Sequence, residues 1–156
     1  LGGDSAGGNL VLITLQQLRS EKLPMPGAAF CISPWADLAC ESPSIVGNAD
    51  RDVMFAANGM RALAHYHVAS HDAKDPLLSP VHGDFSGFPS LLIQVGSTEM
   101  LRDDARRVTE RARAAGVDVR LEEWRDLPHV FHLFAQYIPE GRRAIRHLAA
   151  FVQARA

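Results

Sequence analysis

The sequence has few cysteines, no long apolar run and little net charge, so it lacks the features that mark disulfide-rich, membrane-spanning and nucleic-acid-binding proteins. It holds only two cysteines, Cys31 and Cys40, without C-x-x-C spacing, so neither a disulfide framework nor a thiolate metal site is indicated. No apolar run approaches the roughly 20 residues that a membrane-spanning helix needs. The net charge is only −2, so no basic surface for nucleic acid is expected. The remaining composition, 47% hydrophobic and 22% charged, is that of an ordinary globular domain.

The cysteines and the first residues also bear on location and completeness. Two isolated cysteines are typical of free, buried thiols in a reducing compartment, so we expect a cytoplasmic protein. The chain begins at Leu1, without a methionine, inside a glycine-rich motif. We therefore expect residues 1–156 to be the C-terminal part of one domain. A signal peptide would lie upstream of this segment.

Strand-like and helix-like segments alternate along the chain. Strands are expected over 28–33, 91–96 and 117–125 because these segments are short and apolar or alternating. Helices are expected over 8–20, 52–70, 103–115 and 140–155. This order predicts an α/β fold with right-handed crossovers and a mostly parallel sheet of about three strands, one edge of it unpaired. Residues 40–72 are interpreted as a helical excursion associated with a lid.

The glycine-rich motif is the main chemical signal. Residues 3–7 read Gly-Asp-Ser-Ala-Gly and fit the G-x-S-x-G pattern of a nucleophile elbow. In such an elbow the serine occupies a strained strand-to-helix turn, and the flanking glycines leave its hydroxyl open. The apolar segment that follows suits the required helix. The pattern therefore predicts Ser5 as a nucleophile and the N–H of Ala6 as a donor to an oxyanion.

A serine hydroxyl needs a base to remove its proton, and acids and histidines follow Ser5 in a suitable order. The expected strand 91–96 leads into Glu99 and Asp103, and the strand 117–125 leads into His129 and His132. Both pairs lie just past the carboxyl end of a strand, where open α/β sheets place their sites. The order serine, acid, histidine is that of the elbow-containing hydrolases.

Longer motifs accompany these residues: GDSAGGNL at the start, SPWADL at 33–38, DPLLSP at 75–80, GSTEMLRDD at 96–104 and PHVFHLF at 128–134. Together they resemble the bacterial hormone-sensitive-lipase-like esterases, also called family IV, of the α/β-hydrolase superfamily, over essentially the whole chain. The resemblance implies an α/β-hydrolase fold and a Ser–acid–His triad without a metal or other cofactor. It also implies a small-molecule substrate, a carboxylic ester with a short to medium acyl chain.

The resemblance also ranks the candidate acids and bases. The acid of this family opens an Asp-Pro-Leu-x-Asp pattern, which falls here on residues 99–103, so Glu99 takes the place of an aspartate. Asp103 is the alternative acid, but a carboxylate at the start of a helix can simply stabilise the helix dipole. His129 and His132 both fit the family's His-x-Phe. His129 is preferred because it directly follows the strand, whereas His132 falls where a helical turn begins.

The family's HGGG-type loop, which supplies further oxyanion donors, and part of its lid lie upstream of this chain. We therefore expect the full-length parent to be the active esterase and the chain alone to be weak or inactive. Two other hypotheses stay open: an amide or peptide hydrolase using the same triad, and a catalytically incompetent module that binds another chain. A homo-oligomer would form through the unpaired sheet edge or the terminal helix.

Other conspicuous residues are given structural interpretations. The segment 33–37 is expected to fix the exit from a strand, and Asp75 is expected to form an Asx-type turn. His65, His67 and His71 have no acidic or cysteine partner at ligand spacing, so no metal is expected there.

Overall fold

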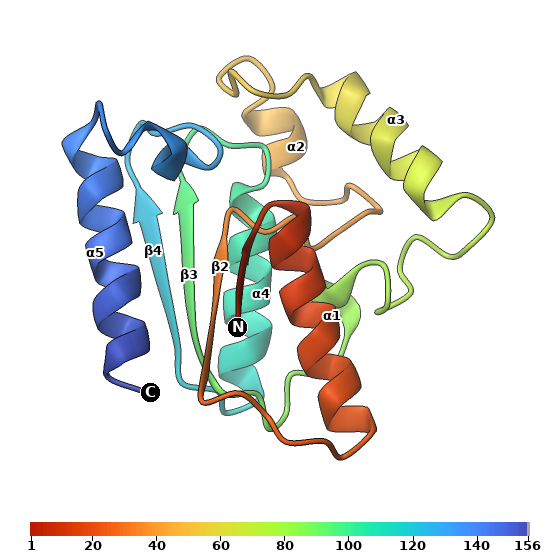
Figure 1. Ribbon diagram of the computed structural model, residues 1–156. Helices are drawn as coiled ribbons and strands as arrows, with labels where there is room; N and C mark the ends of the chain where they lie inside the picture. Colours follow the sequence, from red (N-terminus) through yellow and green to blue (C-terminus); the bar gives the residue numbers. More distant parts are fainter. Residues whose placement is uncertain (156) are drawn as a thin grey trace.

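Four parallel strands form a single sheet in the computed structural model, which describes residues 1–155. The strands are β1 (Gly2–Asp4), β2 (Ala28–Ile32), β3 (Ser90–Gly96) and β4 (Val119–Trp124). They pair in the order in which they occur along the chain. Figure 1 shows β2, β3 and β4 side by side. The sheet has one strand more than expected, because the three residues before Ser5 pair with Phe30, Cys31 and Ile32 of β2.

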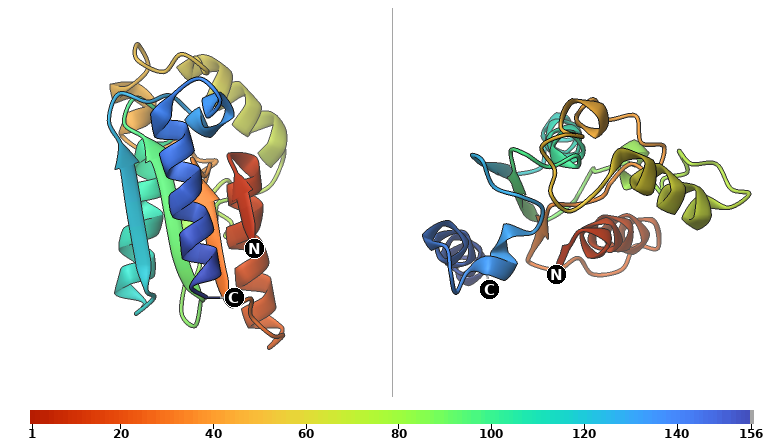
Figure 2. Two further views of the ribbon diagram at one scale, coloured as in Figure 1. Left: turned by 60° about the vertical axis from the view of Figure 1, so that its left-hand side comes forward. Right: turned by 90° about the horizontal axis from the view of Figure 1, so that it is seen from above.

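Helices cover both faces of this sheet. The helices are α1 (Ala6–Ser20), α2 (Ser44–Gly47), α3 (Ala57–Val68), α4 (Arg102–Ala114) and α5 (Pro139–Gln153), with short 3-10 helices at Pro80–His82 and Phe131–Phe134. Those that lie against the strands are α1, α4 and α5. Helices α1 and α4 share one apolar core with the strands, whereas α5 packs on the opposite face (Figure 2). The predicted α/β class and parallel sheet are confirmed.

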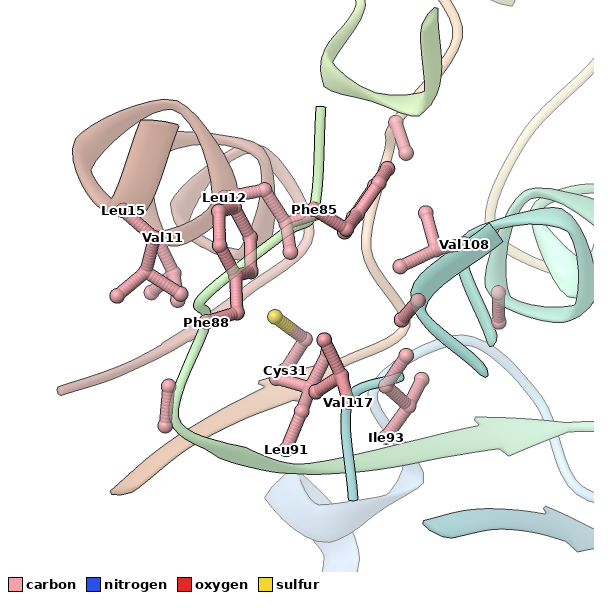
Figure 3. Packing of buried hydrophobic residues seen from close by; sticks show 14 of the residues in the cluster. Val11, Leu12, Leu15, Cys31, Phe85, Phe88, Leu91, Ile93, Val108 and Val117 are labelled. Carbon is pink, nitrogen blue, oxygen red and sulfur yellow. The ribbon is translucent and has the colours of Figure 1, made fainter. Parts of the chain in front are cut away.

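The main core lies between the sheet and the helices α1 and α4. Cys31, Leu91 and Ile93 point from the strands to this side, where Leu12 and Val108 meet them from the two helices (Figure 3). All five side chains are fully buried. Burial of each large aliphatic side chain contributes about 1.5–3 kcal/mol, so this layer holds the strand ends in fixed relative positions.

The excursion between β2 and β3 differs most from its expected structure. The helix expected over 52–70 begins only at Ala57, and the short helix α2 was not expected at all. Asp52 explains the late start, because its carboxylate accepts the N–H groups of Met54 and Phe55 at 2.9 and 3.2 Å. Such an Asx-type turn competes with helix formation. Asp75 forms the expected turn of the same kind, accepting the N–H of Leu77 at 2.9 Å.

Residues 40–72 pack on an apolar cluster separate from the main core. Met60, Ala64 and Val68 of α3 meet Met100 and Leu101, which follow β3. Trp35, Leu38 and Ile45 complete this cluster. The excursion is therefore anchored on the loop that leaves β3, close to the predicted acid.

The two cysteines match the expected free, buried thiols only in part. Cys31 and Cys40 are both free thiols. Burial raises the pKa of Cys31 to about 12, so this cysteine behaves as a small apolar side chain. Cys40 is only half-buried, less than predicted. Within residues 1–155, the helices are too short or too polar to cross a bilayer.

Candidate active site

Ser5 lies on the tight turn between β1 and α1. Its φ of +52° and ψ of −119° belong to a region that residues other than glycine rarely adopt. Hydrogen bonds to β2 and to the segment that follows it hold the turn. The N–H of Ser5 donates to the carbonyl of Ile32 at 2.9 Å, and the carbonyl of Ser5 accepts the N–H of Trp35 at 3.1 Å. The Ser5 side chain remains partly exposed. This is the strained backbone that a nucleophile elbow requires.

Two glycines of the motif allow the turn to close. A Cβ on Gly3 would lie 2.4 Å from the carbonyl oxygen of Gly7, and a Cβ on Gly8 would lie 2.9 Å from Cβ of Pro34. Both approaches are too short for any side chain. Gly7 differs, because a Cβ there would meet no atom of the described residues within 4 Å. Steric crowding therefore requires glycine at positions 3 and 8, whereas no atom of the described residues requires it at position 7.

Ala6 is the first residue of α1. An N–H in the first turn of a helix has no acceptor within that helix, and the helix dipole places partial positive charge there. The backbone at Ala6 therefore has the properties of an oxyanion donor next to Ser5.

Glu99 and His129 form a buried pair between the ends of β3 and β4. Nδ1 of His129 lies 2.9 Å from Oε2 of Glu99, and the two residues are 3% and 0% exposed. With Nδ1–H donating to the carboxylate, Nε2 carries the lone pair that can accept a proton. The ring of Phe55 packs edge-on against His129 with centroids 4.9 Å apart, which restricts rotation of the imidazole.

The loops that carry this pair are bonded to each other. Thr98 donates from Oγ1 to the carbonyl of Leu127 at 2.8 Å, and the N–H of Ser97 donates to the carbonyl of Trp124, also at 2.8 Å. A Cβ on Gly96 would lie only 2.1 Å from the Leu127 oxygen. The absence of a side chain at Gly96 therefore lets the histidine loop cross the end of β3.

The alternative acid and base have other partners. Asp103 is bonded to Arg102 and Arg106 at 3.0 and 3.1 Å. Partial burial opposes its ionisation, but these arginines keep the pKa of Asp103 below its ordinary value. Nε2 of His132 lies 2.8 Å from Oε1 of Gln94. Burial lowers the pKa of His132 to about 4, against the attraction of nearby carboxylates. The structure brings Glu99 and His129 together and gives Asp103 and His132 separate environments.

Three polar residues that were not predicted as site residues support the acid loop. Oγ of Ser33 donates to Oε1 of Glu99 at 2.8 Å. Asn48 donates from Nδ2 to the backbone carbonyl of Glu99 at 2.7 Å, and Asp52 accepts the N–H of Met100 at 2.8 Å. Ser33 belongs to the SPWADL motif, which is a signal in the sequence, whereas no local pattern marks Asn48 or Asp52.

An apolar cavity of about 350 Å³ opens beside Ala6. It lies between α1, α3 and the segments that follow β2 and precede the 3-10 helix at Pro80. Most of its wall is aliphatic or aromatic: Ala6, Leu10, Ile13, Trp35, Leu38, Leu63, Leu77 and Leu78, with Asn9 and His67 as polar members. A hydrocarbon chain fits such a wall better than a charged group does.

Among the described residues, one group has ligand atoms close enough together to hold a metal ion. Its members are Asp37, Glu41 and His82. Asp37 is already paired with the guanidinium of Arg107, and Glu41 is paired with Lys74 at 2.7 Å. The carboxylates are thus neutralised by side chains of the protein. Ser5, Glu99 and His129 do not belong to the group.

A parallel sheet that carries a serine elbow, and later in the chain an acid and a histidine after two further strands, defines the class of α/β hydrolases. The family model described as the alpha/beta hydrolase fold matches residues 1–133. The chain belongs to this family, and its predicted place among the bacterial hormone-sensitive-lipase-like esterases is confirmed by the relatives described next.

Known relatives are similar over nearly the whole chain. An acetyl-hydrolase of Streptomyces hygroscopicus is 48% identical over 98% of this chain and 51% of its own length. An esterase of Acinetobacter venetianus is 33% identical over 97% of this chain and 50% of its own length. A crystal structure of an esterase from the bacterial hormone-sensitive lipase family superposes with a TM-score of 0.96 at 43% identity, over 99% of this chain and 52% of that one. The chain thus spans about half the length of the relatives it matches.

Proposed function

We propose that this chain carries the catalytic triad of a serine carboxylesterase, with Ser5 as nucleophile, His129 as general base and Glu99 as the acid. The observation that carries the proposal is the buried 2.9 Å bond between Glu99 and His129, at the same edge of the sheet as the strained turn of Ser5. Because Asp4 is paired with Ile32 and the strands are all parallel, the loops that bear these residues leave the sheet at one edge.

In the proposed reaction Nε2 of His129 removes the hydroxyl proton as Ser5 attacks the ester carbonyl. The tetrahedral oxyanion is stabilised by the N–H of Ala6. His129 then returns the proton to the leaving alcohol, and an acyl-enzyme forms. Water attacks the acyl group with the same base, which releases the acid and restores Ser5. The carboxylate of Glu99 holds the imidazole in one tautomer and stabilises its charged form.

The substrate that we propose is an ester with a short to medium acyl chain. The apolar cavity beside Ala6 supports this, since it adjoins the proposed oxyanion donor and offers about 350 Å³. The relatives named above, an acetyl-hydrolase and an esterase, are consistent with a small ester.

Labelling and turnover of the natural full-length protein test the proposal. Wild-type protein should react with a fluorophosphonate at Ser5 and hydrolyse 4-nitrophenyl butyrate, and Ser5→Ala should lose both reactions while its circular dichroism stays unchanged. Substantial turnover by Ser5→Ala would remove this residue from the role of nucleophile.

Two other functions are separated by further measurements. Faster cleavage of 4-nitroanilides than of the matched 4-nitrophenyl esters would identify an amide hydrolase that uses the same triad. A stable oligomer that fails to react with the fluorophosphonate would identify a non-catalytic module.

A further inference from the structure

The hydroxyl of Ser33 is a buried junction between three strand ends. Ser33 directly follows β2 and is 0% exposed. Its Oγ donates to Oε1 of Glu99 at 2.8 Å and accepts the N–H of Val130 at 3.2 Å. One side chain therefore touches the proposed acid and the residue that follows the proposed base.

The two carboxylate oxygens of Glu99 have separate partners. Oε2 faces Nδ1 of His129, whereas Oε1 accepts both the Ser33 hydroxyl and the N–H of Gly96. A glutamate has one more rotatable bond than the aspartate usual in this family. Donors on Oε1 restrict rotation about that bond and so aim Oε2 at the imidazole.

The backbone at Ser33 indicates that its side chain is needed. Its φ is +48°, a conformation that glycine adopts freely and that costs other residues free energy. Val130, at the other end of the Oγ bond, has a φ of +47° and is β-branched, which is rarer still. Two strained residues thus meet at one hydroxyl, and a glycine at position 33 would relieve the strain but lose both bonds.

We propose that Ser33 is a positioning residue for the triad: its hydroxyl fixes the carboxylate of Glu99 and, through the Val130 N–H, the loop that carries His129. The inference rests on the esterase function proposed above. It assigns no contact with substrate to Ser33.

The test uses Ser33→Ala and Ser33→Gly in the natural full-length protein. Both remove the hydroxyl, but glycine also relaxes the backbone, so at least one variant should fold. Because a hydrogen bond to a charged group is lost, we expect kcat for 4-nitrophenyl butyrate to fall about 10- to 100-fold in both, with little change in KM.

A pH profile separates positioning from simple destabilisation. In the proposed mechanism His129 must be free to accept the serine proton, and Glu99 is the carboxylate bonded to it. Loss of a donor on Oε1 leaves more negative charge on the carboxylate that faces Nδ1, which favours the protonated imidazole. The acid limb of kcat/KM should therefore move to higher pH in both Ser33 variants.

Ser79→Ala is the matched control. Ser79 is equally buried, and its Oγ also accepts a backbone N–H, from Leu38, and donates to an oxygen, the carbonyl of Ala73. This control should lose a similar amount of thermal stability and keep the wild-type kcat and acid limb.

The outcomes are distinct. Wild-type kcat in the Ser33 variants would overturn the proposal. It would also be overturned if the Ser33 variants lost kcat without a shift of the acid limb and Ser79→Ala lost kcat to the same extent. Retained activity in Ser5→Ala would instead overturn the esterase mechanism itself.

Discussion

At the scale of single residues, the candidate site is built from residues whose backbone conformation or burial costs free energy by itself. Ser5 has a positive φ, and Glu99 is an acid with no exposed surface. Each such feature costs on the order of 1–3 kcal/mol and persists only where neighbouring bonds fix it. Among those bonds, the N–H of Ser5 donates to the carbonyl of Ile32, and the side-chain amide of Asn48 donates to the carbonyl of Glu99.

Replacement of Glu99 by glutamine tests which acid acts. The amide keeps the shape of the side chain but favours the wrong imidazole tautomer, so kcat should fall by about 10⁴-fold. Glu99→Asp should keep much more activity, and Asp103→Asn, matched in chemistry, should keep nearly all of it. Steady-state hydrolysis of 4-nitrophenyl butyrate measures all three. A larger loss in Asp103→Asn than in Glu99→Gln would reverse the assignment.

His132 should make the stability of the protein depend on pH. Its pKa falls from 6.5 to about 4 because the ring is buried, so the unfolded chain binds a proton more readily than the native protein between these values. Stability contributed by the neutral ring is therefore present above about pH 6.5 and decreases as the pH falls toward 4.

Urea unfolding of wild type and His132→Gln at pH 7 and pH 5 measures this contribution. The glutamine does not titrate, so the wild type should lose more stability than the variant between the two pH values. Equal losses in the two proteins would contradict the prediction.

At the scale of secondary-structure elements, the order of strands and helices could be predicted from the sequence, and so could the loops that carry Glu99 and His129. Apolar periodicity and the glycine motif are local signals, and they sufficed for these elements. Asn48 and Asp52 could not be found this way, and Ser33 stood out only as part of the SPWADL motif. Their bonds to the acid loop join residues 48–66 positions apart, which no local pattern reports. The strand β1 was missed because three residues carry almost no periodicity.

The cavity between α1 and α3 should set the preferred chain length. A tryptophan in place of Leu63 would fill part of the space, so kcat/KM should fall more for 4-nitrophenyl octanoate than for the acetate. Leu23→Trp is the matched control, since both leucines are 47% exposed and Leu23 does not line the cavity. An equal change for both esters in Leu63→Trp would place the acyl chain elsewhere.

The bonds between the excursion and the acid loop should contribute to stability. Asn48→Ala removes the donors to the carbonyls of Ser97 and Glu99, at 3.1 and 2.7 Å, and leaves these acceptors without that partner. The loss should be about 1–3 kcal/mol, which lowers the melting temperature by several degrees. Differential scanning calorimetry measures it, and an unchanged melting temperature would show that water replaces the amide.

At the scale of the whole molecule, the described sheet ends at β1, whose outer side has no neighbouring strand within residues 1–155. The relatives are about twice as long, and the resemblance assigns the HGGG-type oxyanion loop to the preceding half. We therefore predict that the 156-residue chain alone hydrolyses 4-nitrophenyl butyrate at least about 10²-fold more slowly than the natural full-length protein. Near-equal rates would show that Ala6 and the described strands suffice.

The sequential order of the strands has a consequence for synthesis on the ribosome. Because β1 to β4 pair in chain order, each new strand can add to the edge of those already made. Ser5 also precedes His129 in the chain, so the proposed nucleophile emerges before the proposed base. At typical translation rates the interval is on the order of ten seconds. During that time the proposed nucleophile has no base beside it, so we expect its reactivity to arise only after His129 has emerged.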